Sequence, residues 1–367
     1  MARLGEYITE YSQKNTNNEY RPVAVGKYGI RSRESIYKKE LAADYSKNKV
    51  IFKDTLTVGM GSKQIDIGIL SEDECYSVSP AYRTYKISGI DSKYLGLCLQ
   101  AKNKEMFESY VKQSARQGKT IDFKRWLDFE IPVPKEQVQT KIVDDLEMLN
   151  ELITYQEEKV ALLDELVKAR FVEVFGNESN PYNWPMVSIE SVADVQVGVV
   201  IKPAQYYTDQ AHGTKAFRSL NIGEMFIKDE DWVYFSDEGN QKNKKSILKE
   251  NDLLIVRSGA PGTSCVVTAE YAGSNAIDVI IAHPDINKVN PYYLCAYTNF
   301  PHGKYQIEKG TGGAAQQHFN VGKYNAMQLM LPPMSLQNEF QNFLRQIDKS
   351  KFIEALRLAK RKQRHYN

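Results

Sequence analysis

The chain has 367 residues, more than one ordinary domain needs and enough for two globular units. Hydrophobic residues make up 42% and charged residues 26%, and no apolar run reaches the roughly 18 residues of a membrane span. This composition excludes intrinsically disordered and membrane-spanning classes. The formal net charge of +2 is too small to indicate a nucleic-acid partner by itself. The distribution of charge along the chain therefore matters more than its sum.

The amino-terminal segment 1–6 lacks the long apolar stretch of a signal peptide, which predicts a cytoplasmic protein. The cysteines are widely separated and form no Cys-x-x-Cys pair, and no histidine stands at zinc-finger spacing. We therefore expect no disulfide framework and no metal site, and we expect buried thiols at Cys75, Cys98, Cys265 and Cys295.

Residues 1–134 are predicted to form the first globular unit, and a short β-type run at 49–52 lies within it. This unit has 22 basic and 17 acidic side chains, a net charge of +5. The segment 59–63 resembles a phosphate-binding loop in its two glycines, but it lacks the remaining spacing of that motif. A β-turn is the better interpretation.

Residues 135–174 are predicted to form one long helix of roughly 60 Å, at about 1.5 Å per residue. Pro132 and Pro134 precede the helix and Gly176 follows it, as expected for its start and stop signals. Its apolar stripe has alternating steps of four and three and consists of Ile142, Leu146, Leu149, Ile153, Gln156, Val160, Leu163 and Val167.

Residues 176–334 are predicted to form the second globular unit, starting near 180–185. Its runs at 253–256 and 276–281 are β-type, and 291–297 is helical. Both units therefore fit an α/β or α+β fold with a twisted sheet. The second unit has 13 basic and 16 acidic side chains, a net charge of −3. If the protein binds DNA, we therefore expect partner subunits to supply much of the non-specific attraction to phosphate.

Residues 335–367 are predicted to form a second long helix, with Phe340, Phe343, Leu344 and Ile347 on its apolar face. This segment has a net charge of +5, whereas 135–174 has a net charge of −5. Opposite charge and matching apolar stripes favour packing of the two helices against each other. Two independent solvated helices are the alternative.

The chain contains an internal repeat. Residues 131–137 and 331–337 lie 200 residues apart, and each segment opens a long helix. Three further pairs of segments follow in the same order and at nearly the same offset: 116–121 with 316–321, 94–95 with 293–294, and 54–56 with 252–254. We therefore expect two copies of one unit, a globular domain followed by a long helix.

Catalytic motifs are absent from the sequence. It has no Walker A loop, no Gly-x-Ser-x-Gly, no His-Glu-x-x-His and no Asn/Asp-Pro-Pro-aromatic tetrapeptide of amino-methyltransferases. The five histidines are scattered, and surface or core positions explain them better than metal ligation.

Flexible, polar, Gly-rich segments recur at equivalent places in the two units, at 114–119 and 310–318. Arg can pair with guanine and Gln with adenine in the major groove, and Lys neutralises phosphate. Ordinary surface loops are the alternative interpretation. On this chemistry the candidate DNA-binding residues are Lys63, Arg116, Gln117, Lys119 and Lys124 in the first unit, and Arg218, Arg257, Gln316, Gln317 and His318 in the second.

With these features the chain resembles the specificity subunit of a type I restriction-modification system. The resemblance covers nearly the whole chain. It rests on the tandem repeat, on the proline motifs 132–137 and 332–337 with a long helix behind each, and on the segments 184–189, 192–195, 217–222 and 251–255. Two departures affect the proline motifs. Val133 separates two prolines that the family usually has side by side, and Leu336 stands where the first motif has Glu136.

The resemblance implies a non-catalytic subunit in which each globular unit is a target-recognition domain for one half of a bipartite double-stranded DNA sequence. The long helices, at 135–175 and 335–367, would form an antiparallel coiled coil that fixes the spacing between the two recognition domains. Two modification (methyltransferase) subunits would dock on one such chain, and restriction subunits would join them. The expected spacer and partner contacts are Gln137, Leu146, Leu149, Ile153, Val160, Leu163, Gln337, Phe340 and Ile347.

The same resemblance implies no cofactor on this chain, because S-adenosylmethionine belongs to the methyltransferase and ATP with Mg to the restriction subunit. Three alternatives remain: the specificity subunit of a type II two-component system, an enzyme (nuclease or methyltransferase) with an unrecognised motif, and a coiled-coil scaffold for proteins alone.

Overall fold

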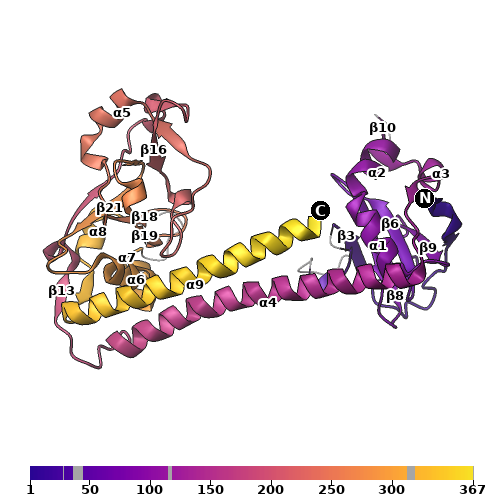
Figure 1. Cartoon of the computed structure of the whole chain (residues 1–367), viewed down its shortest axis with the longest axis horizontal. Helices are drawn as coiled ribbons and strands as arrows, with labels where there is room; N and C mark the ends of the chain where they lie inside the picture. Colours follow the sequence, from indigo (N-terminus) through magenta and orange to yellow (C-terminus); the bar gives the residue numbers. More distant parts are fainter. Residues whose placement is uncertain (28, 36–43, 115–117, 312–318, 367) are drawn as a thin grey trace. The chain divides into compact units, whose positions relative to one another are not determined.

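The computed structural model describes residues 1–27, 29–35, 44–114, 118–311 and 319–366 (Figure 1). The chain divides into two compact units, residues 1–154 with 365–367, and residues 155–364. Helix α4 (Glu136–Phe175) contributes to both units.

The first unit is built on a four-stranded antiparallel sheet. Its strand order is β2-β9-β6-β7, with bounds Ile8–Tyr11, Arg83–Ile87, Thr55–Met60 and Ile65–Leu70. Apolar side chains of these strands alternate toward helices α1 (Ser92–Ala101), α2 (Asn103–Tyr110) and α3 (Phe123–Trp126), and the buried Tyr85 and Trp126 pack with ring centroids 5.9 Å apart. The core of this unit lies between the sheet and these helices.

Among its described residues, the first unit also contains four two-stranded ladders and two short 3-10 helices. The ladders are β1–β12 (Ala2–Arg3, Glu130–Ile131), β3–β4 (Val23–Gly26, Gly29–Ser32), β5–β8 (Lys49–Ile51, Tyr76–Val78) and β10–β11 (Val111–Ser114, Gly118–Ile121). The 3-10 helices are η1 (Leu4–Glu6) and η2 (Arg33–Ser35). Gly59 and Met60 of the segment expected to form a β-turn end strand β6, and the chain reverses over residues 61–64, where the Gly61 N–H donates to the Gln64 carbonyl at 3.1 Å.

The second unit contains a second four-stranded antiparallel sheet. Its order is β14-β21-β18-β19, with bounds Ala193–Val197, Val279–Pro284, Leu253–Val256 and Ser264–Val266. The predicted strand at 253–256 is β18, and the predicted run at 276–281 is divided between β20 (Asn275–Ala276) and β21. Asp278 lies between β20 and β21 with φ +49°, a left-handed conformation that separates the two strands.

A further sheet and several helices surround that core. The sheet has the order β15-β17-β16-β20, with β15 Tyr207–Thr208, β17 Val233–Phe235 and β16 Thr214–Phe217, and the ladder β13–β22 joins Met186–Ser188 to Gln328–Met330. The α-helices are α5 (Asp237–Lys242), α6 (Pro291–Asn299), α7 (Pro301–Thr311), α8 (Val321–Asn325) and α9 (Met334–Tyr366). The 3-10 helices are η3 (Ile189–Ser191), η4 (Pro203–Tyr206), η5 (Ser219–Asn221), η6 (Lys244–Ser246) and η7 (Ala269–Tyr271).

The two units repeat one arrangement, as the sequence predicts. The sheets β2-β9-β6-β7 and β14-β21-β18-β19 have the same order, and the helices α1, α2 and α3 are matched by α6, α7 and α8. Equivalent helices are also capped in the same way. The Asp91 and Asn290 side chains accept from the first-turn N–H groups of α1 and α6, and Asp122 and Asn320 do so for α3 and α8. Both main sheets are antiparallel, so the fold is α+β.

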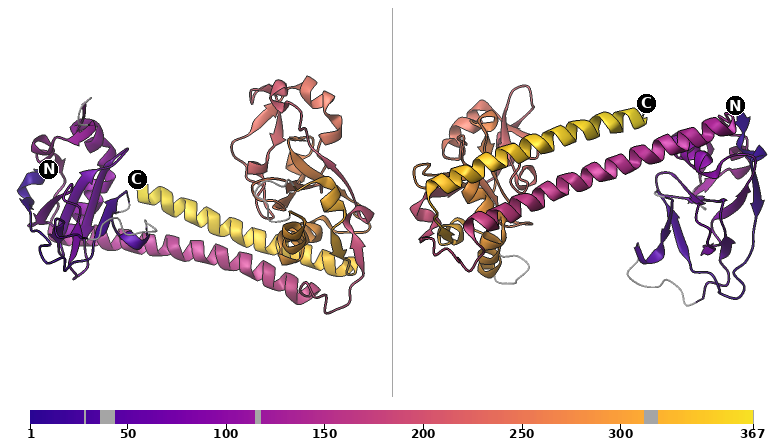
Figure 2. Two further views of the ribbon diagram at one scale, coloured as in Figure 1. Left: turned by 180° about the vertical axis from the view of Figure 1, so that it is seen from behind. Right: turned by 60° about the horizontal axis from the view of Figure 1, so that its bottom comes forward.

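The two long helices are present as predicted. Helix α4 ends before Gly176, which has φ +85° and forms the left-handed end of the helix. In the second unit α9 runs beside the carboxyl-terminal half of α4 (Figures 1 and 2). Arg170 pairs with Glu339 at 3.2 Å and Asp164 pairs with Lys351, so these parts of the helices are antiparallel.

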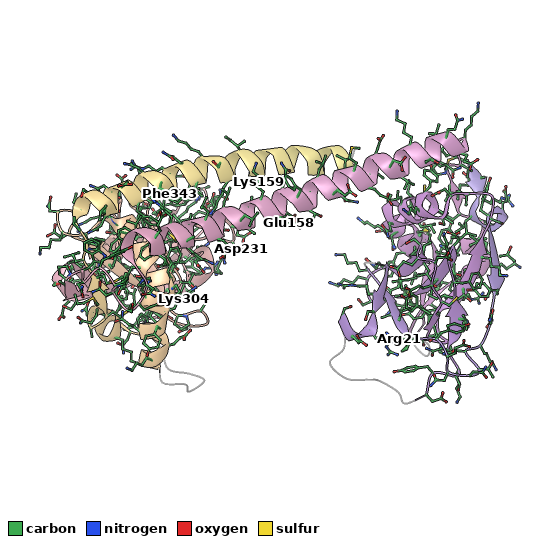
Figure 3. All side chains as sticks on the ribbon, turned by 90° about the horizontal axis from the view of Figure 1, so that it is seen from below. Arg21, Glu158, Lys159, Asp231, Lys304 and Phe343 are labelled. Carbon is green, nitrogen blue, oxygen red and sulfur yellow. The ribbon has the colours of Figure 1, made fainter. Side chains whose placement is uncertain are left out.

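An aromatic core joins these two helices to the second domain. Phe171 and Phe175 of α4 meet Phe340 of α9 at ring-centroid distances of 5.3 and 5.6 Å, and Phe171 stacks on Tyr293 of α6 at 5.6 Å. All four rings are buried. Phe343 of α9 and the exposed Glu158 of α4 can be located in Figure 3.

The cysteines do not all follow the expectation of buried thiols. Cys265 and Cys295 are buried, Cys98 is half-buried, and Cys75 is exposed in the turn between β7 and β8. Burial raises the pKa of the Cys295 thiol to about 12. None of the helices formed by the described residues is long and apolar enough to cross a membrane.

Candidate nucleic-acid interface

Each long helix is attached to its domain by a buried glutamine. Gln139 Oε1 accepts the Asp91 N–H at 2.9 Å, and Gln139 Nε2 donates to the Pro134 carbonyl at 2.8 Å. In the second unit, Gln337 accepts the Asn290 N–H at 2.8 Å and donates to the Pro332 carbonyl at 2.7 Å. The glutamine therefore bridges the cap of a domain helix to the proline turn that starts a long helix.

This repeat corrects the register of the proline motifs. Pro134 corresponds to Pro332 and Gln139 to Gln337, an offset of 198 residues instead of the 200 of the sequence match. Gln137, which the match pairs with Gln337, is exposed. The sequence match pairs the first proline of one motif with the first proline of the other. In the structure the equivalent prolines are instead the two whose carbonyl accepts a hydrogen bond from the buried glutamine.

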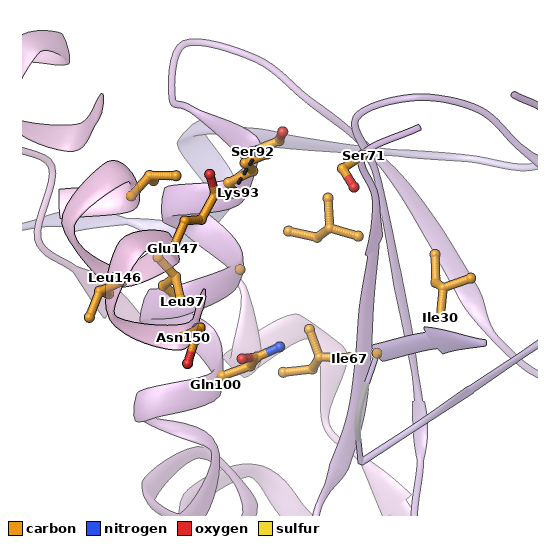
Figure 4. Close-up of a pocket in the computed structure, with 14 residues that line it drawn as sticks. Ile30, Ile67, Ser71, Ser92, Lys93, Leu97, Gln100, Leu146, Glu147 and Asn150 are labelled. Carbon is orange, nitrogen blue, oxygen red and sulfur yellow. Dashed lines mark hydrogen bonds and ion pairs between the residues drawn. The ribbon is translucent and has the colours of Figure 1, made fainter. Parts of the chain in front are cut away.

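The first domain also holds the beginning of α4 through side chains along the helix. Lys93 of α1 pairs with Glu147 at 2.7 Å, and Val143 is buried. A hollow of about 350 Å³ lies between β7, α1 and α4, with Leu146 and Asn150 on its helix side (Figure 4). The domain core and these contacts together fix α4 on the domain.

The other predicted helix residues are half-buried or buried. Leu149, Ile153, Val160 and Leu163 are half-buried, and Leu163 packs on the core of the second unit. Phe340 and Ile347 are buried in that core. Leu163, Phe340 and Ile347 therefore contribute to the core of the second unit.

In the first unit the predicted DNA contacts fall on three elements. Lys63 is exposed in the β6–β7 turn, Lys119 is on β11, and Lys124 is exposed on α3. Lys119 Nζ donates to the Ser62 carbonyl at 2.7 Å and lies 5.2 Å from the centre of the Phe107 ring. Lys119 thereby holds β11 against the turn that carries Lys63.

Arg218 of the second unit is held by its own domain. It follows β16, its backbone N–H donates to Asn221 Oδ1 at 3.0 Å, and its guanidinium donates to the Asp231 carbonyl. Nearby, Lys215 Nζ pairs with Asp229 at 2.7 Å and lies 4.7 and 4.9 Å from the centres of the Trp232 and Tyr271 rings. The hydrogen bond from Lys215 lowers the pKa of the Asp229 carboxyl.

Arg257 is largely enclosed by its own domain. Its side chain is 18% exposed, its NH1 pairs with Asp278 at 2.5 Å, and its Nε donates to the Phe319 carbonyl at 3.3 Å. The Phe319 N–H returns a bond to the Arg257 carbonyl at 3.1 Å. Arg116, Gln117, Gln316, Gln317 and His318, the other predicted DNA contacts, lie outside the described residues.

The structure adds one exposed group that the sequence analysis did not select. The loop after β14 presents Ile201, which is 79% exposed, and Lys202, whose backbone has φ +45°. The sequence signal was weak, because Val199-Val200-Ile201 reads as part of a strand. Residues other than glycine rarely adopt the left-handed conformation, so the backbone at Lys202 is locally constrained.

An acid–histidine pair occurs in the second sheet. His283 Nδ1 lies 2.6 Å from Asp252 Oδ1, and its Nε2 lies 2.8 Å from the Gln196 side chain. Asp252 also accepts the Lys249 N–H at 2.7 Å. Both ring nitrogens are thus engaged within the sheet, and the pair links β14, β18 and β21. Among the described residues, no group of three or more His, Cys, Asp or Glu side chains is placed to hold a metal ion.

Comparison with known proteins gives this architecture a family. The profile of the family described as "Type I restriction modification DNA specificity domain" matches twice, at residues 5–165 and 164–360. Among curated protein sequences, none matches this chain.

Two solved structures share the fold over the whole chain. One, described as "Structural basis underlying complex assembly and conformational transition of the type I R-M system", is 15% identical with a TM-score of 0.64, covering 100% of this chain and 95% of that chain. The type I restriction-modification S subunit from M. genitalium is 12% identical with a TM-score of 0.51, covering 100% and 97%. This chain belongs to the family of type I restriction-modification DNA specificity subunits and carries two tandem copies of its domain.

Proposed function

We propose that this chain reads a bipartite double-stranded DNA sequence, one half with each domain, and that it brings methyltransferase and restriction subunits to that sequence. The observation that carries the proposal is the second family match, because two complete copies of one recognition domain suit two half-sites. The repeated sheet order and the repeated glutamine bridge support equivalent roles for the copies.

The outer face of α4 in the second unit supports docking of a protein partner. Tyr155, Leu162 and Leu166 are 64%, 68% and 47% exposed. They follow one another at steps of seven and four, which places them on one side of a helix. Exposed apolar side chains in such a row are typical of an interaction surface. We propose that a methyltransferase subunit covers this row, and two such subunits per chain follow from the repeat.

The proposal assigns the chemistry to the partners. S-adenosylmethionine would be bound by the methyltransferase, and ATP with Mg by the restriction subunit, so this chain would need no cofactor and would work in the cytoplasm. A direct test is to incubate the purified chain alone with duplex DNA and S-adenosylmethionine. We expect no methyl transfer, and transfer by the lone chain would favour an enzyme.

The recognition function is tested by selection from a random-sequence duplex library, using the full chain co-purified with a methyltransferase subunit of the same genome. We expect enrichment of two short half-sites at a fixed separation. Recovery of a stable protein complex without any enriched sequence would contradict recognition and favour a scaffold for proteins alone. Restriction by the methyltransferase-bound complex with no third subunit would instead favour a type II two-component system.

The docking surface is tested by Leu162→Glu, with Ala161→Glu as the matched control. Ala161 is also exposed but is turned by about 100° from Leu162 around the helix and lies outside the apolar row. We expect Leu162→Glu to reduce co-purification of the methyltransferase subunit and Ala161→Glu to leave it unchanged. Equal co-purification of both variants would place the docking surface elsewhere.

A further inference from the structure

Three segments of the second unit meet at the Arg257–Asp278 ion pair. Arg257 is at the start of the β18–β19 turn, where the Gly262 N–H returns to the Val256 carbonyl at 3.0 Å. Arg257 also binds Phe319 by side chain and backbone, as described above. Phe319 itself is buried and packs against Tyr324. The Arg257 guanidinium therefore binds a residue that the domain core already holds in place.

Asp278 connects the same ion pair to the loop after β14. The Asp278 N–H donates to the Val199 carbonyl at 3.1 Å, and the Val199 N–H donates to the Ala276 carbonyl at 2.8 Å. Gly198 allows this close approach, because a Cβ at that position would lie 2.4 Å from the Ala276 oxygen. The base of the loop 198–202 is therefore held by the chain that carries Asp278.

The exposed end of that loop carries Lys202, which can reach a phosphate more easily than Arg257 can. The NH1 and Nε groups of Arg257 are already engaged, and moving this side chain to a phosphate would break an ion pair and a hydrogen bond to a backbone carbonyl. Lys202 is exposed, and among the described residues its ammonium group has no ion-pair or hydrogen-bond partner. A free ammonium can neutralise a phosphate without breaking an existing interaction.

We propose that Arg257 and Asp278 are positioning residues that clamp together a DNA-contact face of the second domain, and that Lys202 on the clamped loop supplies a phosphate contact of this face. The face consists of the loop 198–202, the turn 257–263 and the chain at Phe319. The inference rests on the proposed DNA recognition and goes further by separating residues that hold the face from a residue that touches DNA. It also revises the expectation that Arg257 itself binds DNA.

The substitution of Asp278 distinguishes the two roles most sharply. If Arg257 contacted phosphate, Asp278→Asn would remove a competing negative charge and tighten DNA binding. If the pair is a clamp, Asp278→Asn weakens binding, as does Arg257→Lys, which keeps the positive charge but cannot make both contacts of the guanidinium. The double variant should then bind no more weakly than the weaker of its two single variants, because each removes the same interaction.

The experiment measures the affinity of the full chain, with its methyltransferase subunit, for the duplex selected in the library experiment, at several NaCl concentrations. For Arg257→Lys and Asp278→Asn we expect a loss of about tenfold, as for a charged hydrogen bond, with an unchanged salt slope. For Lys202→Ala we expect the slope of log K against log salt to decrease in magnitude by about 0.9, as for one lost phosphate contact.

A matched control lies at the other end of β21. Lys288 pairs with Asp285 at 3.4 Å, and Lys288→Ala removes an exposed ion pair of the same domain. It should change neither affinity nor slope, and thermal unfolding of each variant confirms that the domain is folded. Tighter binding by Asp278→Asn, or an unchanged slope for Lys202→Ala, would overturn the inference. The proposed function would still stand, because the wild-type chain would already have selected a DNA sequence. Failure of the wild-type chain to select any sequence would overturn both.

Discussion

Gln337 accepts the backbone N–H of Asn290 at 2.8 Å, so the first turn of α9 caps the start of α6. Gln139 accepts the Asp91 N–H in the first unit in the same way. In both units the glutamine also donates to a proline carbonyl just before the long helix. One glutamine side chain in each unit thus links the start of a long helix to the cap of a domain helix.

The glutamine bridge is expected to contribute to stability in both units. Gln139→Ala and Gln337→Ala each leave a cap N–H without its acceptor, which should lower the free energy of unfolding by about 2 kcal/mol. Urea unfolding measures the loss. Gln137→Ala is the control in the first unit, because Gln137 is exposed, and it should behave as the wild type. An equal effect of Gln137→Ala and Gln139→Ala would contradict the structural register.

The aromatic core between α4, α9 and α6 should dominate the attachment of the helices to the second domain. Phe340→Ala removes a buried ring that contacts Phe171 and Phe175, and a loss of about 3–5 kcal/mol is expected for a large-to-small change of this kind. Leu162→Ala on the exposed side of α4 should cost much less. Similar unfolding curves for the two variants would show that the helices are held by other contacts.

The ion pairs between α4 and α9 should add little. Arg170 and Glu339 are 31% and 62% exposed, and pairs of this kind contribute less than about 1 kcal/mol. A double-mutant cycle with Arg170→Ala and Glu339→Ala measures the pair directly. A coupling energy well above 1 kcal/mol would contradict this expectation and would mean that charge complementarity contributes substantially to the pairing of the helices.

His302 makes stability depend on pH. Burial lowers its pKa, against the opposing effect of the Gly176 carbonyl, which lies 3.0 Å from Nε2. The neutral ring is therefore favoured in the folded state, and the unfolded state takes up a proton more readily below about pH 6.5. Stability contributed by the neutral ring is present above that pH and is lost as the pH falls through the folded pKa.

Urea unfolding between neutral and mildly acidic pH tests this effect. His302→Gln should flatten the acid side of the profile, whereas His212→Gln, at an exposed position, should keep the wild-type dependence. A profile unchanged by His302→Gln would assign the acid sensitivity to other groups.

The sequence was sufficient for the elements with strong periodicity. The stripe from Ile142 to Val167 predicted α4, and Gly176 marked its end because a left-handed residue was needed there. The tandem repeat could be predicted because its matching segments occur in the same order in both halves of the chain, although each match has low similarity. Sequence spacing could not give the register of Gln139 with Gln337, because that depends on which carbonyl the side chain reaches in the folded domain.

The candidate DNA-contact residues were harder to predict. Arg257 has the chemistry of a base or phosphate contact, but its role depends on Asp278 and Phe319, which are 21 and 62 residues away in the chain. Lys202 gave no signal because a left-handed lysine cannot be recognised from composition. Contacts between distant segments decide which cations are available, and local patterns do not contain that information.

The central claim is that the two domains each recognise half of one DNA sequence. The most direct measurement is to co-express the chain with a methyltransferase subunit of the same genome, in a host without adenine methylation, and to map modified adenines by single-molecule sequencing. The account predicts a bipartite motif that requires both chains, and one half of it should change when residues 180–334 are replaced by another recognition domain. A motif that stays the same after this replacement, or methylation without any motif, would contradict the account.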